Sequence, residues 1–415
     1  MKKLLAVTLV GIISAEAFAE AAYITNVVSR QRWPWSQKVD IDFTVGGTEK
    51  CDVDITATWD GQATPVSLAV SGQVMSLAGG DHHAVWDPVA AGITTSLAGF
   101  RVTVTKADPA DRQYLVVDLT TGEKTFYAEP PSGGFNIDAY KTSKLVMRRI
   151  TASPVTFTMG YSSEIMTAAS EINARSSAHP VTLTDDYYIG IFPVTYDQYS
   201  YVATGAAYTG NKGKRPAGVE EGISYVEIRG STNATDNINW PSTGYAVSSN
   251  SWIAKMRALC GGGDLFDLPT EAQWEYAARC GTDTLFWNGG TAEDITSDAW
   301  TTYLGYTKTQ YQRWVDYVGQ DGWGTANTFG IYHTSGGVEE WCLDQVANSV
   351  LPSATNPVGV TGASGVCAVR GGGWNNDNIK FVAPASRWGT NIYTKQYQYQ
   401  YCGFRLCLHT RNLFE

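Results

Sequence analysis

Alternating apolar and polar residues predict several short strands in the first quarter of the chain. Residues 39–45, 53–58 and 100–105 each place an apolar side chain at every second position, the period of a β-strand with one buried face. Turn residues such as Asp60 and Gly61 separate these runs. Several short strands at this spacing are typical of an immunoglobulin-like β-sandwich. We therefore predict an all-β sandwich domain over residues 20–106.

Residues 107–144 show the pattern of one hairpin. The apolar run 114–119 meets residues 124–127 across a turn at Gly122, and a stretch rich in Pro and Gly then ends the pattern. We predict that this segment connects two domains.

Residues 145–415 are aromatic, rich in Gly and poor in periodic structure. One strong helical pattern runs from Thr270 to Arg279, directly after Pro269. The remainder predicts short strands joined by long loops, and such loops in a compact domain usually carry function. The predicted fold class is therefore α+β, with a loop-rich domain after the sandwich.

The first 19 residues have the pattern of a signal peptide. Two lysines precede the almost wholly apolar run 4–13, and residues 17–19 form a small-x-small cleavage site. That run is too short to span a bilayer, and no other stretch reaches the roughly 18 apolar residues that a span needs. We expect an exported chain that starts at Glu20 and is periplasmic, on the cell surface or secreted, with no membrane span.

The composition fits a folded chain and argues against one class of partner. Of the 415 residues, 43% are hydrophobic and 17% are charged, too few charges for a disordered chain. The net charge is -10 and no basic block occurs, so we expect no nucleic-acid partner. The 7 cysteines include no C-x-x-C pair, which argues against a zinc ribbon or a redox dithiol.

Five sequence blocks follow one another along the last two thirds of the chain. They are Phe-Thr-Met-Gly at 157–160, residues 179–199, residues 268–279 with Leu-Pro-Thr-Glu, residues 326–342 with Gly-Gly-Val-Glu-Glu-Trp, and Val-Arg-Gly-Gly-Gly-Trp at 369–374 with Gly-Phe-Arg at 403–405. Together they resemble the formylglycine-generating enzyme family, also called sulfatase-modifying factors. The resemblance implies a loop-rich relative of the C-type lectin fold over residues 145–415.

Several residues of these blocks are interpreted as structural. Trp274 and Trp341 are large apolar anchors suited to holding loops in place. Glu271 and Glu275 are interpreted as helix caps and buried partners of Arg279 or Arg405 rather than as catalysts.

The sequence departs from the copper chemistry of the resembling enzymes. Those enzymes oxidise a substrate cysteine to formylglycine with two copper-binding cysteines, five residues apart, shortly after the Gly-rich turn. Residues 374–384 contain no cysteine here, and Asn376 stands at the first thiol position. Cys402 and Cys407 are also five apart, but residues i and i+5 on one strand point to opposite faces, which disfavours copper.

The resemblance alone also raises the question of other metal sites and of a disulfide. It implies a calcium site, but Gly337 replaces one ligand and only Glu340 remains as a weak candidate. The three histidines of iron-dependent relatives have no counterpart, since no H-x-x-x-H-x-E helix is present. A structural disulfide is expected from Cys260 to one of Cys402 and Cys407.

Residues 374–401 replace the catalytic segment with a polar and aromatic stretch that is typical of recognition surfaces. The Tyr/Gln alternation at 396–401 predicts a strand with Tyr397, Tyr399 and Tyr401 on one face, and half-buried packing of these rings is the alternative. The segment also resembles the variable region of diversity-generating retroelement targets. The candidate ligand-binding residues are Trp374, Asn375, Asn376, Asp377, Asn378, Trp388, Tyr393, Tyr397 and Tyr399.

Three functions remain open on these grounds. The first is an exported, non-catalytic protein that binds a protein or glycan through residues 374–401. The second is a divergent formylglycine-generating oxidase that acts on a cysteine of a sulfatase-type substrate. The third is a structural surface protein.

Overall fold

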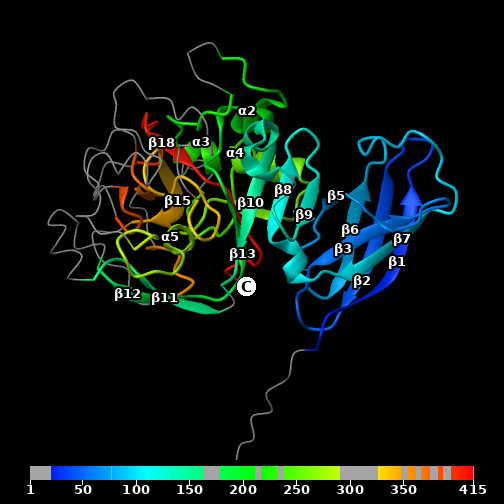
Figure 1. Ribbon diagram of the computed structural model, residues 1–415, viewed down its shortest axis with the longest axis horizontal. Coiled ribbons are helices and arrows are strands. Elements are labelled where there is room, and N and C mark those ends of the chain that lie inside the picture. Colours follow the sequence, from blue (N-terminus) through cyan, green and yellow to red (C-terminus); the bar gives the residue numbers. More distant parts are fainter. Residues whose placement is uncertain are drawn as a thin grey trace, which may run out of the picture.

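The computed structural model shows a mixed, sheet-rich α+β protein (Figure 1). The signal peptide predicted over residues 1–19 lies outside the described residues. The structure describes residues 20–75, 77–131, 133–152, 154–162, 177–210, 216–230, 238–289, 326–346, 354–360, 366–373, 382–386 and 394–414.

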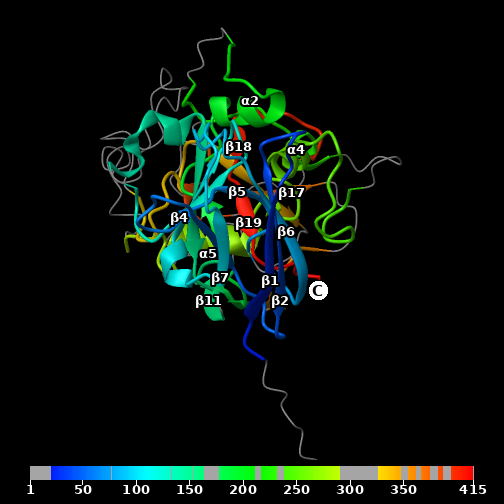
Figure 2. The ribbon, with the colours of Figure 1, turned by 90° about the vertical axis from the view of Figure 1, so that its right-hand side faces the viewer.

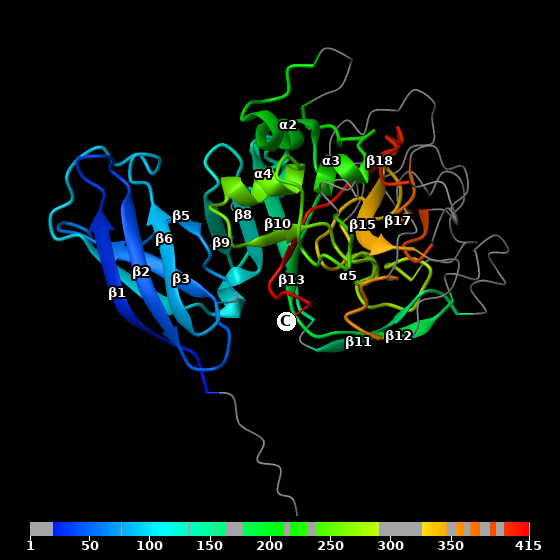
Figure 3. The ribbon, with the colours of Figure 1, turned by 180° about the vertical axis from the view of Figure 1, so that it is seen from behind.

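Residues 20–106, here called the N-terminal β unit, form two antiparallel sheets at one end of the molecule (Figures 1 and 3). Their strand orders are β1-β2-β6-β5 and β4-β3-β7. As the alternation predicted, β2 and β3 bury every second residue, and the buried residues of both sheets join one hydrophobic cluster. The strands are β1 (Tyr23–Gln31), β2 (Val39–Gly46), β3 (Val53–Thr58), β4 (Val66–Ser67), β5 (Val70–Gly72), β6 (Gly80–Trp86) and β7 (Arg101–Lys106).

A six-stranded antiparallel sheet follows, with strand order β14-β19-β13-β10-β8-β9. The predicted hairpin is present as β8 and β9, and it forms one edge of this sheet. Strand β19, near the C-terminal end of the chain, thus lies between β13 and β14, which come much earlier in the sequence. The strands are β8 (Tyr114–Asp118), β9 (Lys124–Tyr127), β10 (Lys144–Ile150), β13 (Tyr187–Gly190), β14 (Leu265–Asp267) and β19 (Cys407–His409). Short 3-10 helices precede β8 and β10, namely η1 (Pro109–Arg112), η2 (Gly134–Asn136) and η3 (Asp138–Lys141).

Two three-stranded sheets complete the strands, with orders β11-β12-β16 and β17-β15-β18. In each of them one pair is antiparallel and one is parallel. The first sheet contains β11 (Val155–Met159), β12 (His179–Leu183) and β16 (Ala354–Thr355), and the second contains β15 (Glu339–Gln345), β17 (Cys367–Arg370) and β18 (Cys402–Phe404).

The predicted helix is confirmed as α5 (Glu271–Arg279). Thr270 caps it in a capping box with Gln273, in which each side chain bonds the backbone N–H of the other. Three helices lie outside the predicted pattern, namely α2 (Tyr196–Thr204), α3 (Tyr225–Arg229) and α4 (Trp252–Leu259). The first two also begin at capping boxes, at Thr195 and at Ser224.

Polar contacts of Arg112 join the N-terminal β unit to the six-stranded sheet. Figure 2 shows the molecule from the side of the β unit, with β1, β2 and β6 toward the viewer. The Arg112 guanidinium donates to the carbonyl of Val53 and lies 2.7 Å from Asp54 Oδ1. Tyr188 of β13 donates to the carbonyl of Arg112, with a distance of 2.8 Å. Arg112 is buried, and its contacts with Val53 and Tyr188 are shielded from water, whereas the Asp54 carboxylate is partly exposed.

Candidate functional site

The glycine-rich turn and the Gly-Gly-Val-Glu-Glu-Trp block meet in the β17-β15-β18 sheet. Glu340 of β15 lies opposite Arg370 of β17 and opposite Gly403 of β18. The Gly336 amide also donates to the carbonyl of Gly371, with a distance of 2.7 Å. This sheet therefore holds the segments that bracket residues 374–401.

Paired charges fill the space between this sheet and α5. Arg370 Nη2 lies 2.8 Å from Glu271 Oε1, and Arg370 Nη1 lies 2.9 Å from Glu275 Oε2. Arg279 Nη1 lies 2.9 Å from Glu275 Oε1. All four side chains are buried, where a charge is stable only with a partner. The two glutamates are thus buried partners of arginines, but they are not the helix caps that the sequence predicted, because Thr270 and Gln273 cap α5.

The arginines that pair with these glutamates differ in part from those that the sequence predicted. Glu275 pairs with Arg279, one of the two arginines proposed. Arg405 pairs instead with Glu340, and Arg370 was missed, although its place beside the glycine turn was visible in the sequence. Trp274 and Trp341 are fully buried anchors, as expected, with 1% and 0% of their surfaces exposed.

Glu340 does not fit a calcium ligand in this arrangement. Its Oε1 accepts from Arg405 Nη2 at 2.8 Å, and its Oε2 accepts from Arg405 Nε at 2.9 Å and Trp274 Nε1 at 2.6 Å. A guanidinium in contact with the carboxylate repels a cation that needs about six oxygen ligands. Within the described ranges, no group of three or more His, Cys, Asp or Glu side chains is placed to hold a metal.

Cys402 and Cys407 do not fit a copper site either. They were expected on one strand, but they lie on β18 and β19, which belong to different sheets. Cys402 Sγ lies 3.4 Å from Glu339 Oε2. Burial raises the pKa of all seven cysteine thiols, to about 12 for Cys260 and Cys367. Monovalent copper needs two thiolates that meet at one ion, and the Cys402 thiol is directed to Glu339 while Cys407 lies on a strand of another sheet.

The expected disulfide is not formed. All seven cysteines are free. Cys260 follows α4 and packs in one hydrophobic cluster, whereas Cys407 packs in another with Tyr187 and Ile189. Cys402 shares the first cluster, but its thiol is directed to Glu339. Hydrophobic burial therefore accounts for these cysteines without a covalent link.

Most of the predicted ligand-binding residues lie outside the described residues, namely Trp374, Asn375, Asn376, Asp377, Asn378, Trp388 and Tyr393. The described end of the segment shows a row of tilted rings in contact, with Tyr397 and Tyr399 centroids 4.6 Å apart and Tyr399 and Tyr401 centroids 6.2 Å apart. Tyr397 is 61% exposed, while Tyr399 is half-buried and lies against Trp341. The strand predicted over 396–401 is wrong, because these residues form turns that no neighbouring strand pairs with.

A groove with a volume of about 310 Å³ is lined by residues of α2, α3 and α4 and of the segment that precedes α4. Its lining includes Tyr199 and Trp252, whose rings stack with centroids 6.0 Å apart, and Glu227. Glu227 Oε1 accepts from Gln398 Nε2 at 2.7 Å. This bond joins the groove to residues 396–401, here called the tyrosine segment. Sequence reasoning missed these lining residues because α2, α3 and α4 bring them together from distant positions.

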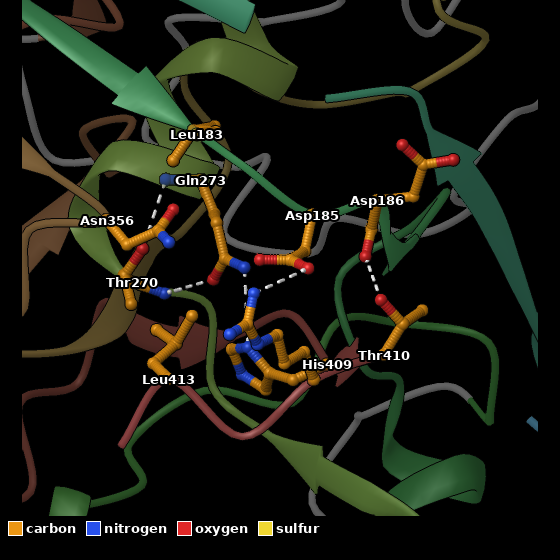
Figure 4. A pocket seen from close by; sticks show the side chains of 10 residues that line it. Leu183, Asp185, Asp186, Thr270, Gln273, Asn356, His409, Thr410 and Leu413 are labelled. Atoms are coloured by element: carbon orange, nitrogen blue, oxygen red, sulfur yellow. Dashed lines mark hydrogen bonds and ion pairs between the residues drawn. The ribbon is translucent and has the colours of Figure 1, made fainter. Parts of the chain in front are cut away.

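A much smaller cavity lies where β12, α5 and β19 meet (Figure 4). Its volume of about 10 Å³ is room for about one water molecule. Gln273 Nε2 lies 3.3 Å from His409 Nδ1, and Asp185 lies 3.5 Å from Arg411 (Figure 4). The side chains around this cavity therefore bond one another, and the place is a structural junction.

The fold and the buried site together define a domain of the sulfatase-modifying type. The sulfatase-modifying factor enzyme 1-like domain family matches residues 141–410. Because this match covers more than half of the chain, the chain belongs to that family. A comparison with curated proteins finds no match. In the described part of the chain, no helix is long and apolar enough to cross a membrane.

Proposed function

We propose that this chain is an exported, non-catalytic ligand-binding protein whose sulfatase-modifying-factor domain presents residues 374–401 as a recognition surface. The observation that carries the proposal is Tyr397, a large aromatic side chain that is 61% exposed and whose ring lies tilted against that of Tyr399, with centroids 4.6 Å apart. An exposed ring on a supported base provides contact area at low entropy cost. Its partner is a protein or glycan outside the cytoplasm.

The chemistry of the cysteines supports binding over catalysis. The family's copper-binding cysteine pair is replaced in residues 374–384, and the seven remaining thiols are raised in pKa by burial. A divergent formylglycine-generating oxidase is the competing function. It would need a thiolate couple that no described pair of cysteines supplies.

The proposal extends to the organisation of the chain. A signal peptide over 1–19 would direct export, and an immunoglobulin-like sandwich over 20–106 and a connector over 107–144 would precede the family domain at 145–415. The likeness of residues 374–401 to a variable region supports diversification by a retroelement. A near-copy of the coding segment beside a reverse transcriptase gene would be the nucleotide signature of that process.

Two measurements test the proposed function. Copper-loaded protein incubated with a cysteine peptide of the sulfatase type should consume no oxygen, and mass spectrometry should detect no formylglycine. An aldehyde product would establish the oxidase instead. Arrays of glycans and displayed peptides then identify a ligand, and Tyr397→Ala should abolish its binding with an unchanged melting temperature. Tyr23→Ala is the matched control, since Tyr23 is 51% exposed on β1.

A further inference from the structure

A second groove lies on the N-terminal β unit. It has a volume of about 590 Å³, within the range of about 300–1,000 Å³ typical of ligand sites. Its residues come from β1 and the turn that follows it, from the start of β2, and from the end of β6 with the loop that leads to β7. These elements precede the family domain, so the groove is separate from the tyrosine segment.

Stacked aromatic rings form a fixed floor. Trp86 is 3% exposed, and its ring is parallel to that of Phe100, with centroids 5.4 Å apart and an angle of 4° between the planes. Phe100 stacks in turn on Trp59, with centroids 6.5 Å apart. Packing on both sides holds the rings of this floor in one conformation. Their conformational entropy is therefore lost when the protein folds, and none is lost when a ligand binds.

Polar residues occupy inward-facing positions on the wall formed by β1. Ser29 lies opposite Ile41 and Gln31 lies opposite Val39, both of which are buried residues of β2. Because paired residues of neighbouring strands point to the same side of a sheet, Ser29 and Gln31 lie on the face where the β2 side chains are apolar. They are nevertheless not buried, and they line the groove. An edge strand that only closed a core would carry apolar residues here.

The groove is open, aromatic and free of charged side chains. Trp33 stands at its rim with 70% of its surface exposed. Arg30 and Arg32 of the same strand and turn pair on the other face with Asp42 and Asp40, and Lys38 of the turn pairs with Asp87, so that these charges are partnered outside the lining. Amides and hydroxyls supply the polar part of the lining, from Gln31, Gln37, Ser29 and residues 94–96.

We propose that this groove binds a neutral oligosaccharide. The Trp33 indole would stack on the flat C–H face of one pyranose ring, while the amides of Gln31 and Gln37 bond the sugar hydroxyls. Each of these amides both donates and accepts, as a hydroxyl does. A proline-rich peptide could also stack on an indole, but its proline residues offer acceptors alone and would leave the amide and hydroxyl oxygens unpaired. The uncharged lining favours a ligand without charge.

Calorimetry of the mature chain with cellohexaose, xylohexaose, chitohexaose and maltohexaose tests the proposal. At least one of these should bind. Trp33→Ala should weaken that binding at least about 10-fold, and Trp33→Tyr should weaken it less. Trp35→Ala is the matched control, because Trp35 is 89% exposed in the same turn but does not line the groove. Its affinity should equal that of the unmodified chain.

The results that would contradict the saccharide proposal are also clear. Absence of binding to all four hexasaccharides would overturn the proposal, and so would equal losses for the Trp33 and Trp35 variants. Binding of decaproline that depends on Trp33, without sugar binding, would assign the groove to a peptide. Tyr397→Ala should leave the saccharide affinity unchanged, so the result is independent of the function proposed for residues 374–401.

Discussion

Single buried residues hold the family domain together through paired charges and packed rings, and Arg405 is one of them. The Arg405 guanidinium bonds Glu340 and also donates to the carbonyls of Gly190 and Tyr332, with distances of 2.8 and 2.7 Å. One side chain thus ties together β13, β15 and the loop before β15. We accordingly interpret Arg405 as a structural residue.

His409 shows a second kind of buried polar residue, one that must stay neutral. Its Nε2 lies 3.0 Å from the Leu268 carbonyl, and its Nδ1 lies 3.3 Å from Gln273 Nε2. These contacts suit the tautomer with the proton on Nε2, because Gln273 donates to Nδ1. Burial lowers the pKa of His409 to about 4.

Acid should therefore destabilise the protein through His409. Below its ordinary pKa of about 6.5 the unfolded chain takes up a proton that the folded chain takes up only near pH 4, so the free energy of unfolding falls in that interval. Between pH 7.5 and 5, His409→Gln should reduce this fall by about 2 kcal/mol in urea unfolding. Equal pH dependence in both proteins would contradict the buried neutral state.

Close backbone contact between elements sets the position of the β8–β9 hairpin. Its turn residue Gly122 has a φ of +78°, and a Cβ there would overlap the carbonyl oxygen of Leu259 at the end of α4. The hairpin turn therefore packs directly on α4. Glycine is needed here both for the backbone conformation and for the space.

Gly122→Ala should lower the free energy of unfolding more than the same change at a glycine without neighbours. Gly61 has a φ of +85° with nothing within 4 Å of the added carbon, so Gly61→Ala isolates the strain of the left-handed backbone, about 1 kcal/mol. The overlap with α4 should raise the loss for Gly122→Ala to about 2–4 kcal/mol in urea unfolding. Equal losses would show that the turn can move away from α4.

Across the whole molecule, a buried ion pair links the N-terminal β unit to the family domain. Lys124 of β9 pairs with Asp264, just before β14, and its Nζ donates to the Gly72 carbonyl of β5 at 2.6 Å. Both charged side chains are nearly fully buried, with 1% and 2% of their surfaces exposed. The β unit is thus held by a contact that water cannot replace.

Lys124→Met should destabilise the protein by about 3–5 kcal/mol, because it leaves Asp264 buried without its partner. It should also speed proteolysis between residues 106 and 113 as the β unit loosens. Lys144→Met removes a more exposed pair with Asp118 and should cost below about 1 kcal/mol. Adding Asp264→Leu to Lys124→Met should recover most of the loss. Equal losses at the two lysines would contradict this linkage.

Local patterns determined much of this protein without tertiary information. The period of two placed β2 and β3, and the helical pattern directly after Pro269 placed α5. These features depend on neighbours within a few residues, so the sequence alone contains their physical cause. The family blocks gave the order of the buried anchors along the chain. They also showed that the copper-binding cysteine pair is missing, which depends only on which residues stand at those positions.

Only the tertiary structure decided which distant residues meet. It put β19 beside β13 and β14, chose Arg370 as the partner of Glu271 and separated Cys402 from Cys407. It also turned residues 396–401 away from strand pairing and opened the groove beside Trp33. Such choices depend on packing between segments far apart in the chain, where many pairings satisfy the same local pattern and the burial of charge selects among them.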